Sequence, residues 1–207
     1  MKRVKRLLVI LFLFISVQQS FAQDQQAVYV GIPSETFGYF ASSQHNTNWC
    51  WAASIQMIFN YYGIDITQEQ IVARSYGVSS TGLLPDWTGN LEVITANLNN
   101  WSVDNGGREY TVRAYCYPGP PTPAYLIQEL SLKRPVLIGY QSGPNSGHIV
   151  VITACSYIST DNGPLIESIV VRDPWPDDEN VANQGRKEWT GIELANKIQA
   201  HWYIVVQ

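Results

Sequence analysis

Apolar and polar positions in the first half of the chain alternate with a helical period. Over residues 50–62 apolar side chains recur every three or four positions, and Gly63 ends the pattern. The run Thr-Gln-Glu-Gln at 67–70 is a capping box, which predicts a second helix ending near Gly77. After a loop rich in Gly, Ser, Thr and Pro, a third helix is expected over about 89–98.

The second half changes to short runs that alternate or are continuously apolar, which is the pattern of β-strands. Two helices interrupt these runs, one over about 122–132 and one capped by residues 190–193. Residues 23–43 have no clear period and are expected to be irregular or an edge strand. Because helices come first and strands later, the pattern predicts an α+β fold with an antiparallel sheet. The strands are expected at 109–117, 135–140, 147–154, 165–172 and 202–206.

The beginning of the chain has basic, apolar and small residues in the order that is typical of a Sec-type signal peptide. Four basic residues precede the apolar run 7–17, and Ser20 and Ala22 are small residues at the two positions that a signal peptidase reads. We therefore expect 1–22 to be a signal peptide, and 23–207 to form one domain of a periplasmic or secreted protein. A membrane anchor is the alternative, but the run is shorter than the ~20 apolar residues of a transmembrane helix.

Charge narrows the choice of partners. The chain has thirteen basic and seventeen acidic residues, a net charge of −4, and loss of the four basic residues of the prefix would leave −8. An acidic exported domain is a poor ligand for nucleic acid or for an anionic membrane surface. We therefore expect neither as a partner once the signal peptide has been removed.

Cys50 stands where the first helix is expected to begin, six residues after Gln44. A thiol at a helix N-terminus faces free N–H groups and the positive end of the helix dipole, and both favour the nucleophilic thiolate. A nearby amide side chain is able to donate a hydrogen bond to the oxyanion that forms when this thiolate attacks a carbonyl. Cys50 and Gln44 are therefore candidates for a nucleophile and an oxyanion donor.

The chain has three cysteines, so one thiol stays unpaired if the exported protein forms a disulfide. Cys116 and Cys155 both lie in strand-like runs and are the candidate pair, which would leave Cys50 free for chemistry. Two buried free thiols are the alternative interpretation of Cys116 and Cys155.

A cysteine nucleophile needs a general base, and the base needs a group that orients it. His148 follows a Gly-rich turn and opens an apolar strand, and Asp173 ends the next strand. If these two strands pair as a hairpin, His148 and Asp173 meet at the same end of the sheet, where the carboxylate would fix the imidazole tautomer. Asp161 and Asn145 are the next candidates for the orienting group.

Four short motifs together carry a family resemblance. Gln44, the run Cys50-Trp51-Ala52, the pair Gly147-His148 and the pair Asp173-Pro174 resemble the oxyanion-hole glutamine, nucleophile, base and acid of papain-like cysteine peptidases. The similarity is to the bacterial branch, which includes leader peptidases that cut after a double glycine and effector proteases with a Trp-Cys-Trp motif. Papain itself has an asparagine where this chain has Asp173.

The resemblance implies a papain-like fold with two lobes. A helical N-terminal lobe would carry Cys50, an antiparallel β-sheet in the C-terminal lobe would carry His148 and Asp173, and the active-site cleft would lie between them. It also implies hydrolysis of peptide or isopeptide bonds in a peptide or protein substrate, through an acyl-thioester.

The same resemblance implies that Trp49, Trp51 and Gly147, the neighbours of nucleophile and base, bind substrate. No cofactor is implied, and no metal, because Cys50 and His148 lack the closely spaced partners of a zinc site. Two alternatives stay open. One is another acyl-transfer enzyme on this fold, such as a transglutaminase or a cell-wall amidase, and the other is an inactive relative that binds peptides.

Overall fold

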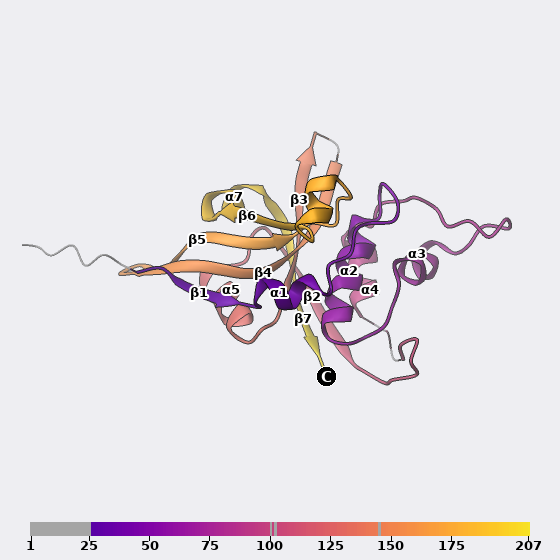
Figure 1. The fold of residues 1–207 in the computed structure, drawn as a ribbon, viewed down its shortest axis with the longest axis horizontal. Coiled ribbons are helices and arrows are strands. Elements are labelled where there is room, and N and C mark those ends of the chain that lie inside the picture. The colour runs from indigo at the N-terminus through magenta and orange to yellow at the C-terminus, as the bar shows by residue number, and fades with distance from the viewer. Residues whose placement is uncertain (1–25, 100, 102, 145) are drawn as a thin grey trace, which may run out of the picture.

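The computed structural model describes residues 26–99, 101, 103–144 and 146–207. The expected signal peptide, 1–22, lies outside these residues. Helices and strands are segregated along the chain as predicted, and Figure 1 shows helices of the first half gathered on one side of a large sheet. Within the described part of the chain, no helix has both the length and the apolar character needed to cross a bilayer.

Within the described residues, the sheet has seven strands and is antiparallel throughout. Its order is β2-β7-β3-β4-β5-β6, and β1 pairs with the far half of the long strand β4. All five predicted strands are present, and most are longer than the sequence pattern indicated. The strands are β1 (Val28–Gly31), β2 (Val112–Pro118), β3 (Val136–Gly143), β4 (Ser146–Thr160), β5 (Gly163–Arg172), β6 (Arg186–Thr190) and β7 (Ile198–Val206).

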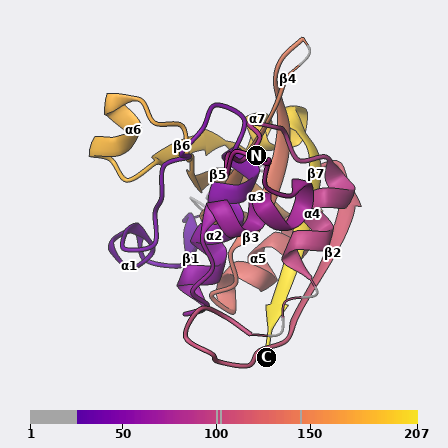
Figure 2. The ribbon, with the colours of Figure 1, turned by 90° about the vertical axis from the view of Figure 1, so that its right-hand side faces the viewer.

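The helices divide between the two faces of the sheet. Figure 1 shows α2, α3 and α4 to one side, away from α5 and α7, and Figure 2, viewed from that side, shows α2, α3 and α4 gathered together. The described helices are α1 (Ser34–Gly38), α2 (Cys50–Tyr61), α3 (Gln68–Tyr76), α4 (Leu91–Leu98), α5 (Pro123–Ser131), α6 (Asp178–Ala182) and α7 (Gly191–Lys197).

Alternation along the strands builds two hydrophobic cores. Leu137, Ile149 and Trp202 point to one face of the sheet and pack with α2, α3 and α4. Their chain neighbours Ile138 and Val150 point to the other face and pack with α5 and α7. Because side chains of a strand alternate between faces, each central strand serves both cores, which is why these runs are continuously apolar in the sequence.

The first turns of α2 and α3 are built differently. In α3 the Thr67 hydroxyl accepts from the Gln70 N–H, and the Gln70 side chain accepts from the Thr67 N–H, so the predicted capping box is confirmed. In α2 the N-cap position is Trp49, and no side chain caps the helix. The first N–H groups of α2, at Cys50 and the next residues, therefore remain available to an acceptor that is not part of the cap.

The predicted hairpin of β4 and β5 is confirmed. Its register pairs Ile152 with Val171 and Ala154 with Val170, so Thr153 is an extra residue in β4, a β-bulge. The Thr153 side chain is buried, and its carbonyl accepts from the Ile32 N–H. On the open side of this bulge the hairpin ends with His148 on β4 and, directly after β5, Asp173.

Two expectations need correction. Residues 23–43 contain β1, which agrees with the expected edge strand, but also the short helix α1, and the stretch between β5 and α7 contains α6 and β6; the periodicity did not predict α1, α6 or β6. The proposed Cys116–Cys155 disulfide is wrong, because both thiols are free. Cys116 lies on β2 and Cys155 on β4, with β7 and β3 between them, and adjacent strands are about 4.8 Å apart.

Candidate active site

Two adjoining cavities meet at Cys50 and His148. Each has a volume of about 410 Å³, and both are lined by these two residues together with Tyr140 and Gly147. Cys50 is the first residue of α2, and His148 is near the start of β4. The thiol and the imidazole therefore come from the helical and the sheet halves of the chain and lie together on the wall of one cleft.

The His148 ring has partners on both sides. Its Nε2–H donates to Oδ1 of Asp173 at 2.7 Å, which leaves Nδ1 for the side-chain hydrogen bond with Cys50. Burial disfavours the imidazolium, but the hydrogen bonds and charges of Asp173 and Cys50 outweigh it and raise the pKa of His148 to about 9. At neutral pH the ring is therefore held in its charged form beside the thiol.

Asp173 is buried, and both of its carboxylate oxygens are occupied. Oδ1 accepts from His148 and from the Trp175 N–H at 2.9 Å, and Oδ2 accepts from Nζ of Lys187 at 2.9 Å. Burial raises the pKa of this carboxyl, but the hydrogen bond and charge of His148, with the bonds from Lys187 and Trp175, lower it to about 2. Asp173 is therefore an anion across the physiological range, and its Oδ1 is hydrogen-bonded to the His148 imidazole.

Sequence reasoning missed Lys187, which lies on the unpredicted strand β6. Lys187 lies in a run of charged residues of both signs, Arg-Lys-Glu, which is typical of a solvent-exposed strand. The alternatives for the orienting group are not at this site. Asp161 is exposed in the turn at the opposite end of the hairpin, and Asn145 lies outside the described residues.

Gln44 is buried beside the start of α2, but its amide is turned toward its own loop. Nε2 donates to the carbonyls of Asn46 and Thr47, at 2.9 and 2.6 Å. Its Oε1 is buried without a partner among the described residues. Both N–H groups of the Gln44 amide are thus engaged by its own loop, so Gln44 would have to release one loop carbonyl to donate to another acceptor.

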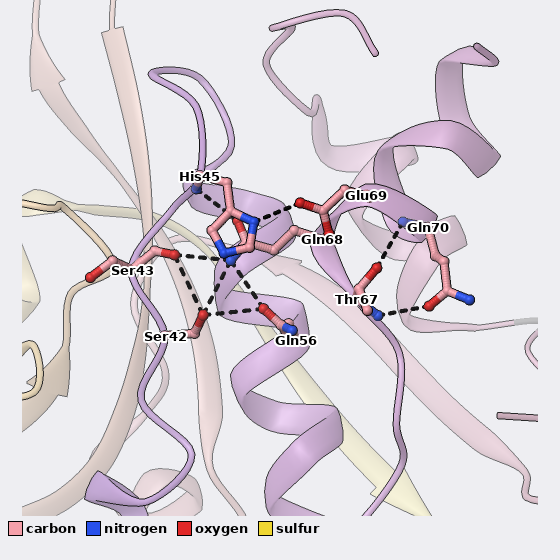
Figure 3. Close-up of polar contacts among 8 residues, drawn as sticks. All are labelled: Ser42, Ser43, His45, Gln56, Thr67, Gln68, Glu69 and Gln70. Atoms are coloured by element: carbon pink, nitrogen blue, oxygen red, sulfur yellow. Dashed lines mark hydrogen bonds and ion pairs between the residues drawn. The ribbon is translucent and has the colours of Figure 1, made fainter. Parts of the chain in front are cut away.

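A polar network fastens the Gln44 loop to the helices, as Figure 3 shows. The fully buried Gln68 side chain of α3 donates to the Ser43 carbonyl at 2.9 Å and to Oε1 of Gln56 at 3.0 Å, and it accepts from the His45 N–H at 3.0 Å. The neighbouring Glu69 carboxylate pairs with the His45 ring at 2.6 Å. The two backbone groups that flank Gln44 are therefore fixed to α3.

The three expected substrate-binding residues have different surroundings. Gly147 lines both cavities, and Trp51 lines one of them while its Nε1–H donates to the Trp87 carbonyl. Trp49 is 2 % exposed, lines neither cavity and donates to the Pro85 carbonyl. For Trp49 the structure favours a role in anchoring the loop near residue 85 over contact with substrate.

The functional groups at the site are of the kinds used in acid–base and nucleophilic catalysis. Among the described residues, no cluster of three or more His, Cys, Asp or Glu side chains is arranged to hold a metal ion. The imidazolium, the thiol and the buried carboxylate instead form a chain of hydrogen bonds that ends at the uncapped helix. This arrangement suits attack of sulfur on a carbonyl carbon.

Comparison with solved structures shows a papain-like fold. Procathepsin B S9 from Trypanosoma congolense superimposes with a TM-score of 0.54 at 9 % identity, over 86 % of this chain and 77 % of that chain. Digestive procathepsin L2 from Tenebrio molitor larval midgut gives 0.50 at 14 % identity, over 85 % and 68 %. The peptidase domain of Streptococcus ComA gives 0.49 at 12 % identity, over 79 % and 96 %.

Among curated proteins, none matches the sequence. The Peptidase_C39 like family does match, over residues 37–204, a span that includes Gln44, Cys50, His148 and Asp173. That span covers most of the chain and every element of the site. The chain therefore belongs to the Peptidase_C39 like family, and it is a cysteine-type peptidase with a papain-like fold.

Proposed function

We propose that the protein is an exported peptidase that hydrolyses peptide or isopeptide bonds through Cys50, His148 and Asp173. The observation that carries this proposal is the hydrogen-bonded order of the three side chains, with His148 between the thiol and the carboxylate. The uncapped N-terminus of α2 and the cleft on either side of Cys50 support it further.

In the first half-reaction the Cys50 thiolate attacks the carbonyl carbon of the scissile bond. The negative charge that develops on the carbonyl oxygen is stabilised by the Cys50 N–H and the dipole of α2, and by Gln44 once its amide is released. His148, held as an imidazolium, gives its Nδ1 proton to the departing amine. The carbon–nitrogen bond breaks and an acyl-thioester remains on Cys50.

In the second half-reaction His148, now neutral, takes a proton from water while the water oxygen attacks the thioester carbonyl. The carbon–sulfur bond breaks, the carboxylic acid product leaves, and the thiolate–imidazolium pair is restored. Asp173 keeps Nε2–H donated to its own oxygen in both steps, so Nδ1 always faces the sulfur.

The test is digestion of a complex peptide mixture by the protein, read by mass spectrometry. We expect new peptide ends that disappear after alkylation of Cys50 and in the Cys50→Ala and His148→Ala variants. New ends that persist in Cys50→Ala would refute the assignment of the nucleophile. Amide transfer to an added primary amine, without free acid as product, would favour an acyltransferase instead.

Export is a separate part of the proposal and rests on the order of basic, apolar and small residues in 1–22. We expect the mature protein to begin near Gln23, as determined by N-terminal sequencing of material from the periplasm or medium. Retention of residues 7–17 in that material would contradict removal of a signal peptide.

A further inference from the structure

Strand β6 places a cation, the ammonium group of Lys187, beside Asp173. Lys187 pairs with Val171 across the β5–β6 ladder, two residues before Asp173. Residues two apart on a strand share a face, so the long lysine side chain runs diagonally toward the carboxylate. The ladder itself continues to the site, because the Asp173 N–H donates to the Gly185 carbonyl at 2.7 Å.

We propose that Lys187 is a positioning residue of this active site, which holds Oδ2 of Asp173 so that Oδ1 remains directed at His148. The proposal rests on the proposed function, because it assigns Lys187 to the same triad. Lys187 lines neither of the two cavities that contain Cys50, so it acts through Asp173 and not on the substrate.

The burial of the two partners argues for this role. The Asp173 side chain is 5 % exposed, whereas the Lys187 side chain is 36 % exposed and reaches inward from the surface. Without Lys187, Oδ2 would be a buried carboxylate oxygen with no hydrogen-bond donor among the described residues, and burying an unpaired charged oxygen is energetically costly. The carboxylate would then gain by rotating toward water or by taking up a proton, and either change weakens its bond to His148.

The other groups around the carboxylate do not replace the lysine. His148 on β4 and the Trp175 N–H both bind Oδ1. The phenol of Tyr140 on β3 has its pKa raised by burial and by the charges of Asp173 and Cys50, so it remains neutral. Among the described residues, Lys187 is therefore the cation that faces Oδ2 of Asp173.

The kinetic test compares Lys187→Met with Lys187→Arg and with a matched control, Lys197→Met. Lys197 also pairs with a carboxylate at 2.9 Å, that of Glu193, but this carboxylate is 38 % exposed. We expect Lys187→Met to lower kcat about tenfold with little change in KM, because a misplaced base slows the reaction and leaves the cleft intact. Lys187→Arg should retain most of kcat, and Lys197→Met all of it.

A second measurement does not depend on peptidase activity. In a Cys50→Ala background the Asp173 carboxyl carbon is titrated by NMR with and without Lys187→Met. We expect the pKa of Asp173, about 2 with Lys187 in place, to rise by about one unit when the ammonium is removed, and to stay unchanged in Lys197→Met.

The outcomes separate the two proposals. An unchanged Asp173 titration in Lys187→Met would overturn the role of Lys187, whatever the wild-type protein cleaves. A shifted titration with unchanged kcat would also overturn it, because the ion pair would then not bear on catalysis. If the wild-type protein hydrolyses no peptide, the proposed function fails, and the titration still shows whether Lys187 holds the carboxylate. Rates are expressed per folded molecule, with melting temperatures measured for each variant.

Discussion

The Ser54 hydroxyl donates a hydrogen bond of 3.0 Å to the carbonyl oxygen of Ile149, joining α2 to β4. Ser54 lies four residues after Cys50, on the same side of the helix, and Ile149 directly follows His148. Both residues are buried. This bond therefore ties the position of Cys50 on α2 to the position of His148 on β4.

We expect Ser54→Ala to lower kcat several-fold and to destabilise the protein by about 1 kcal/mol, the usual worth of one buried hydrogen bond. Ser156→Ala is the control, because the Ser156 hydroxyl bonds to that of Ser168 farther along the same hairpin. Urea unfolding and steady-state kinetics measure both effects. Equal loss of kcat in the two variants would show that the Ser54 bond serves stability alone.

Alkylation should single out Cys50. Burial raises the pKa of Cys116, despite a hydrogen bond with Thr95, and raises that of Cys155 to about 12, so both thiols stay protonated at neutral pH. Cys50 has an imidazolium partner and faces the cleft. We expect brief treatment with iodoacetamide at pH 6–7 to label Cys50 first, as read by peptide mapping. Labelling of Cys116 or Cys155 at the same rate would count against an activated nucleophile.

Substitution of Asp173 tests the orientation of the imidazole. Asp173→Ala should lower kcat on the order of 10²-fold or more, because the tautomer and the charge are both lost. Asp173→Asn should retain more, since an amide oxygen still accepts from Nε2 of His148, although its NH₂ group would face the Lys187 ammonium. Melting temperature is measured beside turnover. Full turnover in folded Asp173→Ala would leave a Cys50–His148 dyad.

Gln44→Ala should lower kcat about 10²-fold, as expected for loss of one oxyanion donor. The loop around it is held independently by Gln68, so the fold should change little. Circular dichroism and turnover on a purified substrate measure the two effects. A normal rate would mean that the bonds from Gln44 to Asn46 and Thr47 are its only role.

Stability should depend on pH through His148. Its pKa rises from 6.5 to about 9 on folding, so the imidazolium is favoured in the folded state. The resulting contribution to the free energy of unfolding is complete below pH 6.5 and is lost as the pH rises through 9. We expect the wild-type protein to lose more stability over this range than His148→Ala in urea unfolding. Parallel pH profiles for the two proteins would contradict this linkage.

Local signals made most of the site predictable from sequence. The start of α2 at Cys50 follows from helical periodicity, and the meeting of His148 and Asp173 follows from two strands joined by a tight turn. Such features depend on neighbours in the chain, which a sequence displays directly.

The features that could not be predicted from the sequence depend on pairing between segments that are distant in the chain. Strand β6 is short, begins with three charged residues in a row, and is held by its ladder to β5, so neither its existence nor the contact of Lys187 with Asp173 had a local signal. Strand order likewise decides against the disulfide. Cys116 and Cys155 look alike in the sequence but lie on strands three positions apart in the sheet.

The bulge at Thr153 limits which insertions and deletions the β4–β5 hairpin can accept. The side-chain period of a strand is two, so deletion of one residue between His148 and Thr153 would turn the imidazole from the cleft toward the opposite face. At the other end of the hairpin, residues 161–162 form an exposed turn. Insertions of any length should therefore be tolerated at that turn. Between His148 and Thr153, only insertions or deletions of an even number of residues would keep the His148 side chain on the side of Cys50.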